Sequence, residues 1–293
     1  MDNDEQRRKL TTAVIPAGGN GTRLYPLTSS TPKEMLPVFE KTMIMHSIEE
    51  LYDSGITEII LISNVGKPSL SDFLLPNSPT DEIPKLPGYF SDILDKIHIQ
   101  IIMQEEQLGL GNAILQCSKL INDSDFIVIL PDELFFSETP STKILIENWN
   151  LNPAIYLSAV DVPNEEIRNY GVIKYIENLK VRALTPEKIA EVIEKPETQE
   201  APSNSIINGR YILPSSLFRV LEEASPGVGG EIQLTDSINE LIKKDLPAYA
   251  MTIDGVRFDA GSPLGLLKSS IYSALQEKNS SESILKFMKS YII

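Results

Sequence analysis

The sequence predicts an α/β protein built around a mainly parallel β-sheet that helices flank on both sides. Short apolar runs rich in Ile and Val alternate with longer amphipathic patterns through the first half of the chain. This rhythm is typical of repeated strand–helix–strand units. The runs are continuously apolar, as 59–62 (Ile-Ile-Leu-Ile) illustrates, so we expect a sheet that is buried on both faces.

The predicted strands of the first half follow one another along the chain. They are Thr12–Ile15, Glu58–Ser63, Ile97–Met103, Phe126–Leu130 and Ala154–Val160. Between them lie helical patterns, as in 44–51, where apolar residues stand at i, i+4 and i+7. Similar patterns predict crossover helices at Ala113–Leu120 and Ile144–Trp149, whereas the four prolines within Leu74–Gly88 predict a surface loop.

The rhythm changes after about Asp161, where the strands become shorter and polar turns separate them. The predicted strands here are Val172–Ile176, Glu191–Glu194 and Ile206–Leu213. We expect this second half, 161–262, to add strands to the first half, 10–160, and to form one wall of a cleft. The tail 263–293 is predicted to be helical, and it could mediate self-association or pack on its own domain.

Composition and charge exclude several classes of function. With 41 acidic residues against 26 Lys and Arg, the net charge is −15, and such a field repels phosphate backbones and acidic lipid surfaces. We therefore expect no nucleic-acid partner and no membrane partner. The one cysteine, Cys117, allows no internal disulfide, and two histidines are too few for a histidine-rich zinc site. A start without an apolar export segment predicts a cytoplasmic location.

The most informative segment is the glycine-rich turn after the first predicted strand. Gly18, Gly19 and Gly21 let the main chain approach a ligand closely and direct N–H groups at an anion, as phosphate-binding turns do. The spacing is not that of the dinucleotide fingerprint, because Leu24 stands where its third glycine would be, and no P-loop Gly-Lys-Ser/Thr follows. We expect a nucleotide as the ligand, although such a turn alone also occurs as a plain tight loop.

A second motif, 31–37 (Thr-Pro-Lys-Glu-Met-Leu-Pro), follows soon after, and together the two resemble the signature of sugar-1-phosphate nucleotidylyltransferases. The Pro-Lys-Glu-Met-Leu-Pro form is similar to that of bacterial UTP:glucose-1-phosphate uridylyltransferases, the UDP-glucose pyrophosphorylases, whereas 18–28 is closer to the thymidylyl branch. The resemblance extends from about Thr12 to Gly265. Further landmarks stand in the family's order at 104–113, 130–132, 170–172, 192–196, 208–211, 230–236 and 258–261.

The resemblance implies a Rossmann-like nucleotidyltransferase fold, with sugar-binding strands and C-terminal helices added to it. Residues 10–262 would form the nucleotidyltransferase domain, with a nucleotide-binding half, 10–160, and a sugar-phosphate-binding half, 161–262. The implied reaction joins UTP and glucose 1-phosphate to give UDP-glucose and pyrophosphate with Mg²⁺. The alternatives are an enzyme that uses dTTP or another hexose 1-phosphate, and a catalytically silent nucleotide-sugar sensor. The expected assembly is a homodimer or homotetramer.

The implied reaction needs cations, because it brings two polyanions together: a sugar-phosphate oxygen attacks the α-phosphorus of the nucleotide in line, and pyrophosphate leaves. Arg23 and Lys33 are the predicted catalytic residues that hold the triphosphate and the leaving pyrophosphate. Lys195, in 192–196 (Val-Ile-Glu-Lys-Pro), is predicted to hold the sugar phosphate and to orient its attacking oxygen. Without its motif, each lysine would be interpreted as a surface residue.

Two aspartates are candidates for a magnesium site. Asp132 follows the apolar strand 126–130 and a proline, at the carboxyl edge of the sheet, where open α/β sheets bind ligands. Asp259, in 258–261 (Phe-Asp-Ala-Gly), would add a second carboxylate, and Mg²⁺ takes one or two carboxylates together with phosphate oxygens and water. The alternative for either residue is a turn or helix-cap aspartate.

The remaining assignments are implied by the resemblance. The nucleotide would contact Ala17, Gly18, Gly19, Gly21, Thr22, Glu34, Gln104 and Gly109. The Gln104 amide offers a donor and an acceptor, which suits the edge of a uracil or thymine ring, but it could also serve as a hydrogen-bonding residue at a strand end. The sugar would contact Tyr170, Gly171, Glu194, Asn208 and Gly209. Glu194 beside Lys195 could instead form a solvated ion pair.

Overall fold

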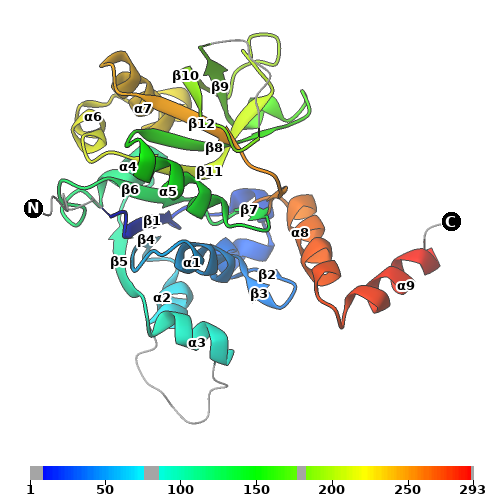
Figure 1. The fold of residues 1–293 in the computed structure, drawn as a ribbon. Helices are drawn as coiled ribbons and strands as arrows, with labels where there is room; N and C mark the ends of the chain where they lie inside the picture. The colour runs from blue at the N-terminus through cyan, green and yellow to red at the C-terminus, as the bar shows by residue number, and fades with distance from the viewer. Residues whose placement is uncertain (1–8, 76–85, 177–182, 292–293) are drawn as a thin grey trace, which may run out of the picture.

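A nine-stranded sheet runs through the centre of the computed structural model, which describes residues 9–75, 86–176 and 183–291 (Figure 1). Its strands are β1 (Thr12–Pro16), β4 (Glu58–Asn64), β5 (His98–Gln104), β6 (Phe126–Ile129), β8 (Ile155–Asp161), β9 (Gly171–Tyr175), β10 (Glu187–Glu194), β11 (Ser205–Leu213) and β12 (Ala248–Thr252). Their order across the sheet is β5-β4-β1-β6-β11-β8-β12-β10-β9. Most of the predicted proline-rich loop falls on 76–85, outside the described residues.

The sheet is mixed, and most of its strands point the same way. β1 pairs in parallel with β4 and β6, and β4 pairs in parallel with β5. β11 is antiparallel to β6 and β8, and β10 is antiparallel to β12 and β9, so within the described ranges only these two strands run against the others. The predicted mainly parallel, mixed sheet is confirmed.

Helices cover both faces of this sheet. One face packs against α4 (Leu110–Leu115), α6 (Leu217–Glu223) and α7 (Leu234–Lys243); the other packs against α1 (Met43–Asp53), α2 (Pro68–Leu74), α3 (Gly88–Leu94) and α5 (Ser141–Leu151). Side chains alternate along β1, so Val14 lies in the first core while Ala13 and Ile15 lie in the second. All three are fully buried, because neither face of the central strands meets solvent.

Two short antiparallel pairs lie outside the main sheet: β2 (Pro37–Val38) pairs with β3 (Lys41–Thr42), and β7 (Glu133–Phe136) pairs with β13 (Val256–Asp259). Neither β7 nor β13 was among the predicted strands, and β12 was also missed. The helix predicted at Ala113–Leu120 was wrong in its extent, since α4 ends at Leu115. Its continuation forms turns with i→i+3 hydrogen bonds, although the apolar spacing carries on.

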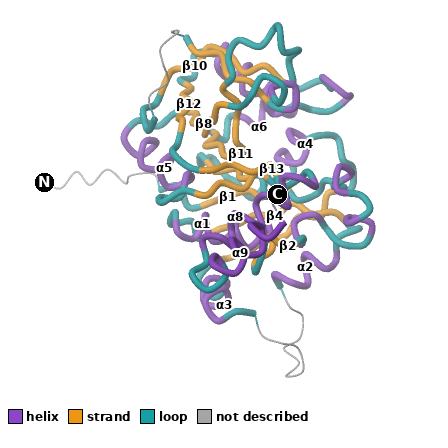
Figure 2. The backbone as a smooth tube through the Cα atoms, turned by 90° about the vertical axis from the view of Figure 1, so that its right-hand side faces the viewer, coloured by secondary structure: helices purple, strands orange, loops and turns teal. Residues whose placement is uncertain are grey.

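The chain ends in the predicted helical tail, which forms α8 (Pro263–Gln276) and α9 (Ser281–Tyr291). Ser262 caps α8, because its Oγ accepts a hydrogen bond from the Gly265 N–H at 3.2 Å. Figure 1 shows that α8 leads away from the sheet and that α9 lies beyond it, apart from the core, and in Figure 2 the same two helices lie on the side that faces the viewer. Of all the described helices, none combines the length and apolar character that crossing a membrane requires.

Candidate active site

The carboxyl ends of β1, β4 and β5 place the glycine-rich turn, 17–21, beside a glutamine. Ala17 extends the strand pairing by donating its N–H to the Ile62 carbonyl at 2.7 Å. Gln104 ends β5 so close to the turn that a Cβ on residue 18 would lie 2.5 Å from the Gln104 Oε1. A side chain at position 18 would therefore displace the Gln104 amide, and the structure brings Gly18 and Gln104 together.

The turn then directs an arginine toward the carboxyl edge of the sheet. Gly21 has a φ of 64°, in the left-handed region that favours glycine, and the short 3₁₀ helix η1 (Thr22–Leu24) follows. Leu24 is buried and anchors η1, whereas Arg23 and Thr22 are exposed. Gly19 is open to solvent, with no atom within 4 Å of a built Cβ.

Two cations and two carboxylates converge beside this turn. Lys33, in the 3₁₀ helix η3 (Lys33–Met35), donates from Nζ to Asp132 Oδ2 at 2.6 Å. Arg23 donates from Nη1 and Nη2 to Asp259 Oδ2 and Oδ1 at 2.7 and 3.2 Å. Arg23 Nη2 also lies 3.9 Å from Asp132 Oδ2. The structure therefore gathers four of the five residues to which the sequence assigned phosphate or metal binding, Lys195 being the fifth.

The β7–β13 pair places the two aspartates next to each other. Asp259 lies opposite Glu133 in the register, and Ala260 donates its N–H to the Asp132 carbonyl at 2.8 Å. A Cβ on Gly261 would lie 2.6 Å from Asp132 Oδ2 and 3.0 Å from Asp259 Oδ1. The two carboxylates thus approach one point, which also lies 2.6 Å from Arg23 Nη2, and a side chain at position 261 would displace these groups.

The opposite charges of Asp132 and Lys33 keep both side chains ionised. Burial alone would raise the pKa of the Asp132 carboxyl, but the charge and hydrogen bond of Lys33, with the charge of Arg23, outweigh it and hold the pKa below its usual value. Burial alone would lower the pKa of Lys33, but Asp132 and Glu34 outweigh it and raise the pKa. Both partners are therefore charged at neutral pH.

A cavity of about 420 Å³ opens beside the charged cluster. Among its lining residues are Arg23, Asp132, Tyr170, Gly171, Glu194, Lys195, Glu231 and Thr235. The nucleotide-side residues come from the carboxyl ends of β1 and β6, and the others come from the strands and loops after Asp161. The cavity joins Arg23, Asp132 and Lys195 to Tyr170, Gly171 and Glu194 of the predicted sugar wall. Lys33 and Asp259 do not line it, but they are paired with Asp132 and Arg23, which do.

Lys195 and Glu194 lie at the end of β10, where the backbone turns sharply. Lys195 has a φ of 45°, donates its N–H to the Tyr170 carbonyl at 3.0 Å, and places its Nζ 3.4 Å from Glu194 Oε1. The Lys195 side chain is 44% exposed, so it is free to move toward a ligand. Glu194 is held from its other side by Thr235, whose hydroxyl donates to Oε2 at 3.1 Å.

Several predicted site residues do not line this cavity. Glu34 is fully buried, with its carboxylate 2.8 Å from Lys67 Nζ, and Lys67 also donates to the Ala17 carbonyl. Asn208 is fully buried, and Gly209, at a φ of 81°, accepts a backbone hydrogen bond from Leu130.

Gln104 lines a separate hollow of about 280 Å³, which is bordered also by Leu108 and Asn112. Gly109, at a φ of 100°, packs close to the backbone of Ile232.

Sequence reasoning missed an ion pair beneath the cluster. Arg257 donates from Nε and Nη2 to the two oxygens of Glu133 at 2.7 and 2.8 Å, and its guanidinium carbon lies 4.3 Å from the centre of the Tyr170 ring. Tyr170 in turn donates its hydroxyl to Asp259 Oδ2 at 3.1 Å. One signal in the sequence could have revealed Arg257. Side chains alternate along a strand, so Arg257 and Asp259, two residues apart, lie on the same face of β13.

Comparisons with known proteins agree with this geometry. Residues 12–274 match the model of the family described as "Nucleotidyl transferase". The chain belongs to this family. A UTP–glucose-1-phosphate uridylyltransferase of Mycoplasma pneumoniae is 36% identical over 97% of this chain and 99% of its own length. The chain is therefore a nucleotidyltransferase, and the predicted fold class and enzyme class are confirmed.

Two solved structures share the whole fold. A UDP-glucose pyrophosphorylase solved with UDP-glucose has a TM-score of 0.83 and 31% identity, and the match covers 92% of this chain and 100% of that one. A UTP-bound UGPase from Acinetobacter baumannii has a TM-score of 0.84 and 26% identity, covering 97% and 100% of the two chains. Each match thus spans residues on both sides of Asp161.

Proposed function

We propose that this chain is a UTP:glucose-1-phosphate uridylyltransferase, which forms UDP-glucose and releases pyrophosphate. The observation that carries the proposal is the convergence of two cations and two carboxylates beside a cavity that Glu194 and Lys195 also line. The relative reported above is named a uridylyltransferase, and the two solved structures are named UDP-glucose pyrophosphorylase and UGPase, so the thymidylyl alternative has less support. A silent sensor would be expected to have lost a charged member of the cluster, and all four are in place.

The reaction requires charge neutralisation rather than a covalent bond to the protein. An oxygen of the sugar phosphate attacks the α-phosphorus, a new P–O bond forms, and the bond to the β-phosphate oxygen breaks as pyrophosphate leaves. Arg23 and Lys33 would hold the triphosphate and the leaving pyrophosphate. Lys195 would hold the sugar phosphate and orient its oxygen, since its exposed side chain reaches the same cavity.

The two aspartates fit a divalent cation, and we propose Mg²⁺. Their oxygens approach one point beside Gly261, and carboxylate oxygens are ligands that Mg²⁺ prefers. In the described ranges no group of three or more His, Cys, Asp or Glu side chains gathers, so phosphate oxygens and water would complete the shell around Asp132 and Asp259. When bound, the ion would neutralise phosphate charge and so favour the approach of the two anions.

The base and the hexose would occupy two different hollows. The base would lie near Ala17, Gly18 and Gln104, where main-chain groups and one amide could pair with a pyrimidine edge. The hexose would lie against Tyr170 and Glu194, with the hydroxyls accepting from and donating to the wall of the 420 Å³ cavity. Residues 10–160 would then serve the nucleotide, and 161–262 the sugar phosphate.

We further propose that the protein works in the cytoplasm as a homodimer or homotetramer. The substrates are phosphorylated metabolites, and the free Cys117 is buried, which suits a reducing compartment. Self-association is supported by α9, in which no described residue is buried.

A matrix of nucleotides against sugar phosphates tests the function. Initial rates of pyrophosphate release would be measured for UTP, dTTP, ATP, GTP and CTP with glucose 1-phosphate, then for UTP with other hexose 1-phosphates. The expected maximum is UTP with glucose 1-phosphate. A dTTP preference of about tenfold, which corresponds to about 1.4 kcal/mol, would instead support the thymidylyl alternative.

A further inference from the structure

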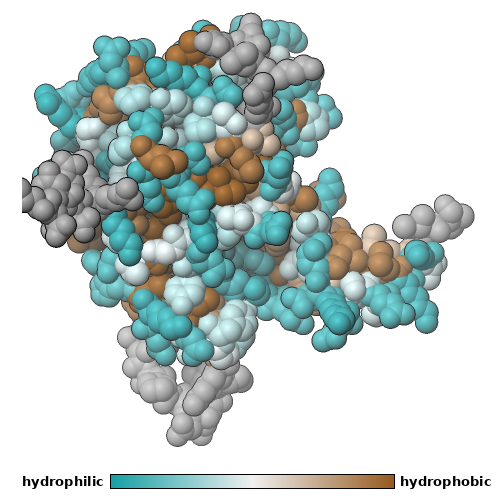
Figure 3. All heavy atoms as spheres, in the orientation of Figure 1, coloured by the Kyte–Doolittle hydropathy of each residue, from teal (hydrophilic) through white to brown (hydrophobic). Residues whose placement is uncertain are grey.

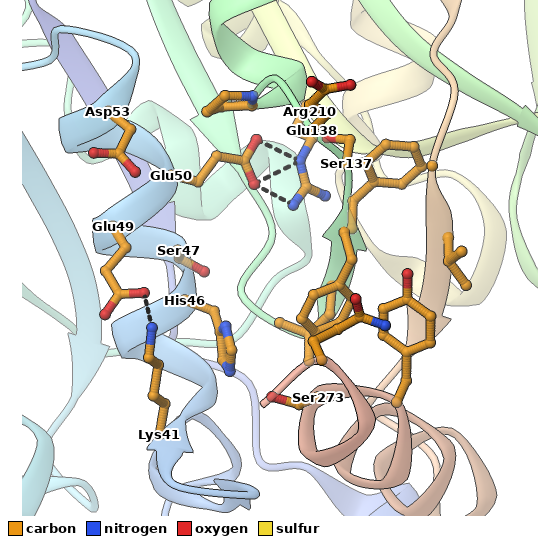
Figure 4. A pocket seen from close by; sticks show the side chains of 18 of the residues that line it. Lys41, His46, Ser47, Glu49, Glu50, Asp53, Ser137, Glu138, Arg210 and Ser273 are labelled. Carbon is orange, nitrogen blue, oxygen red and sulfur yellow. Dashed lines mark hydrogen bonds and ion pairs between the residues drawn. The ribbon is translucent and has the colours of Figure 1, made fainter. Parts of the chain in front are cut away.

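The β7–β13 pair borders two cavities. Glu133 lines the 420 Å³ cavity beside the charged cluster, whereas Phe135, Phe136 and Val256 line a larger cavity of about 680 Å³ (Figure 4). The pair is separate from the nine-stranded sheet, and two strands alone are only marginally stable in water. The position of Asp259 on β13 therefore depends on the side chains that hold this pair in place.

Aromatic packing holds one face of β13. The centre of the Phe258 ring lies 5.9 Å from that of Phe136 and 5.3 Å from that of Tyr272 on α8. Beyond α8 the chain leaves the body of the molecule, as the projecting arm in Figure 3 shows. Because side chains alternate along a strand, Arg257 and Asp259 lie on the opposite face of β13, where ion pairs hold them.

Arg257 is held in one orientation by Glu133. Their side chains are only 8% and 9% exposed, and two hydrogen bonds join them, from Nε at 2.7 Å and from Nη2 at 2.8 Å. Such a two-bond contact between planar groups fixes the direction of the guanidinium group as well as its distance. Its carbon lies 4.3 Å from the centre of the Tyr170 ring, so a fixed cation stands against this ring.

Tyr170 connects the Arg257–Glu133 pair with a proposed metal ligand. Its hydroxyl donates to Asp259 Oδ2 at 3.1 Å, and the same oxygen accepts from Arg23 at 2.7 Å. The main-chain carbonyl of Tyr170 accepts from the Lys195 N–H at 3.0 Å, which ties the Tyr170 backbone to the end of β10. Because the backbone is tied, the placement of the ring decides where the hydroxyl meets Asp259.

We propose that Arg257 is a positioning residue for the candidate active site: it fixes the Tyr170 ring, and the Tyr170 hydroxyl then holds Asp259 in the orientation in which it binds a divalent ion. Arg257 is not among the described residues that line the 420 Å³ cavity, so it acts through Tyr170 and not on a substrate. This role rests on the function proposed above, in which Asp259 is a metal ligand. Loss of a hydrogen bond to a metal ligand commonly weakens metal binding by about 10- to 100-fold.

Tyr170→Phe tests the contact with Asp259, because it removes the hydroxyl and keeps the ring beside Arg257. Binding of Mn²⁺, which takes the same oxygen ligands as Mg²⁺, would be measured by electron paramagnetic resonance on the substrate-free protein. We expect the Mn²⁺ dissociation constant to rise about tenfold or more. The matched control is Tyr175→Phe at the end of β9, which removes a hydroxyl that lies 2.9 Å from Ser205 Oγ and should leave Mn²⁺ binding unchanged. Equal affinities in Tyr170→Phe and the wild type would overturn the proposal.

Arg257→Lys tests the contact with the Tyr170 ring. It keeps a positive charge for Glu133 but loses the planar group that lies against the ring. We expect the Mn²⁺ dissociation constant to rise about threefold or more. Because Arg257 acts through the Tyr170 hydroxyl, the double variant Arg257→Lys/Tyr170→Phe should bind Mn²⁺ no more weakly than Tyr170→Phe alone. Fold-changes that multiply in the double variant would contradict this route.

Thermal unfolding of the same variants separates positioning from stability. A lower melting temperature of Arg257→Lys with unchanged Mn²⁺ affinity would show that the ion pair only stabilises the fold, and would overturn the proposal. Mn²⁺ binding is measured without substrates, so it does not depend on which sugar nucleotide is made. If the wild type forms no UDP-glucose but the Mn²⁺ affinities change as expected, the proposed function fails and the positioning role stands. If it forms UDP-glucose and the affinities are equal, the positioning role alone fails.

Discussion

The Asp132 carboxylate has two proposed roles. It accepts a hydrogen bond from Lys33 in the free protein, and it would bind the divalent ion that the reaction is proposed to use. We expect Asp132→Asn to lower the rate of pyrophosphate release by about 100-fold or more, because one anionic ligand is lost. The change also leaves the half-buried Lys33 ammonium group without its counter-charge, so the free energy of unfolding should fall by about 1–3 kcal/mol. Steady-state rates and urea unfolding measure the two effects, with the exposed Asp123→Asn as control.

Lys195 is predicted to act on one substrate and not on the other. Lys195→Ala should raise the KM for glucose 1-phosphate about tenfold or more while leaving the KM for UTP nearly unchanged, because the ammonium group is proposed to hold only the sugar phosphate. Lys174, on the neighbouring strand β9, is similarly exposed and makes a 3.4 Å contact with Glu191, so Lys174→Ala is the control. Equal effects on both KM values would refute the assigned role.

His46 makes stability depend on pH. Burial, and then the charge of Lys41, lower the pKa of its imidazole from 6.5 to about 4. Between these values the unfolded chain binds a proton that the folded chain does not, so the free energy of unfolding should fall as the pH drops from 6.5 to 4, by roughly 3 kcal/mol. Urea unfolding at several pH values should show a shallower slope for His46→Asn than for the wild type.

Among the elements, α1, α5 and β11 are tied together by one buried carboxylate. Glu50 on α1 pairs with Arg210 of β11, and its Oε1 also accepts from the hydroxyls of Ser141 and Thr142, at the start of α5. Burial alone would raise the pKa of Glu50, but Arg210 outweighs it and lowers the pKa, so the carboxylate stays ionised. This single side chain supplies the acceptor that the first turn of α5 needs.

Glu50→Gln should therefore destabilise the fold by about 3–5 kcal/mol, because it leaves the Arg210 guanidinium buried without a negative partner. Glu49, the next residue, pairs with Lys41 at 2.7 Å nearer the surface, and Glu49→Gln should change stability by no more than about 1 kcal/mol. Thermal or chemical unfolding of the two variants gives the comparison. Similar losses for both would show that burial of the pair does not decide its strength.

The strands that could be predicted from the sequence are those that helices cover on both faces of the sheet. Runs such as 59–62 are apolar at every position, and this pattern can be recognised without knowing what the strand pairs with. β7 and β13 were missed because each has only four residues and pairs with a strand far away in the chain, a contact that no local pattern records. The sequence of α9 likewise could not show whether this helix packs on its own chain or on another copy, because its apolar face suits either surface.

For the site, motifs predicted the charged groups but not their supports. Arg23 and Lys33 were chosen from two short motifs, Asp132 from a strand end and Asp259 from the family landmark 258–261, and the four do converge. The sequence predicted that Glu34 would contact the nucleotide and Asn208 the sugar, but in the structure both residues are fully buried. Whether a residue is buried depends on the distant segments that pack against it, as Lys67 packs against Glu34. The residues of a short motif do not indicate this packing.

At the scale of the whole molecule, the net charge of −15 opposes the approach of both proposed substrates, which are anions. Raising NaCl from about 10 to 150 mM shortens the screening length from roughly 30 to 8 Å. We expect kcat/KM for glucose 1-phosphate to rise over this range while kcat stays nearly constant, because screening affects the encounter. Stopped-flow or initial-rate measurements at fixed Mg²⁺ would check it, and a fall in kcat/KM would show that local cations dominate steering.

The pairing of β7 with β13 also has a consequence for synthesis on the ribosome. The two aspartates of the proposed metal site, Asp132 and Asp259, are far apart in the order in which the chain is synthesised. A nascent polypeptide that already displays the glycine-rich turn and Lys33 still lacks half of its acidic pair. Uridylyl transfer should therefore begin only after residue 259 has emerged from the exit tunnel, which prevents shorter nascent chains from consuming nucleotide.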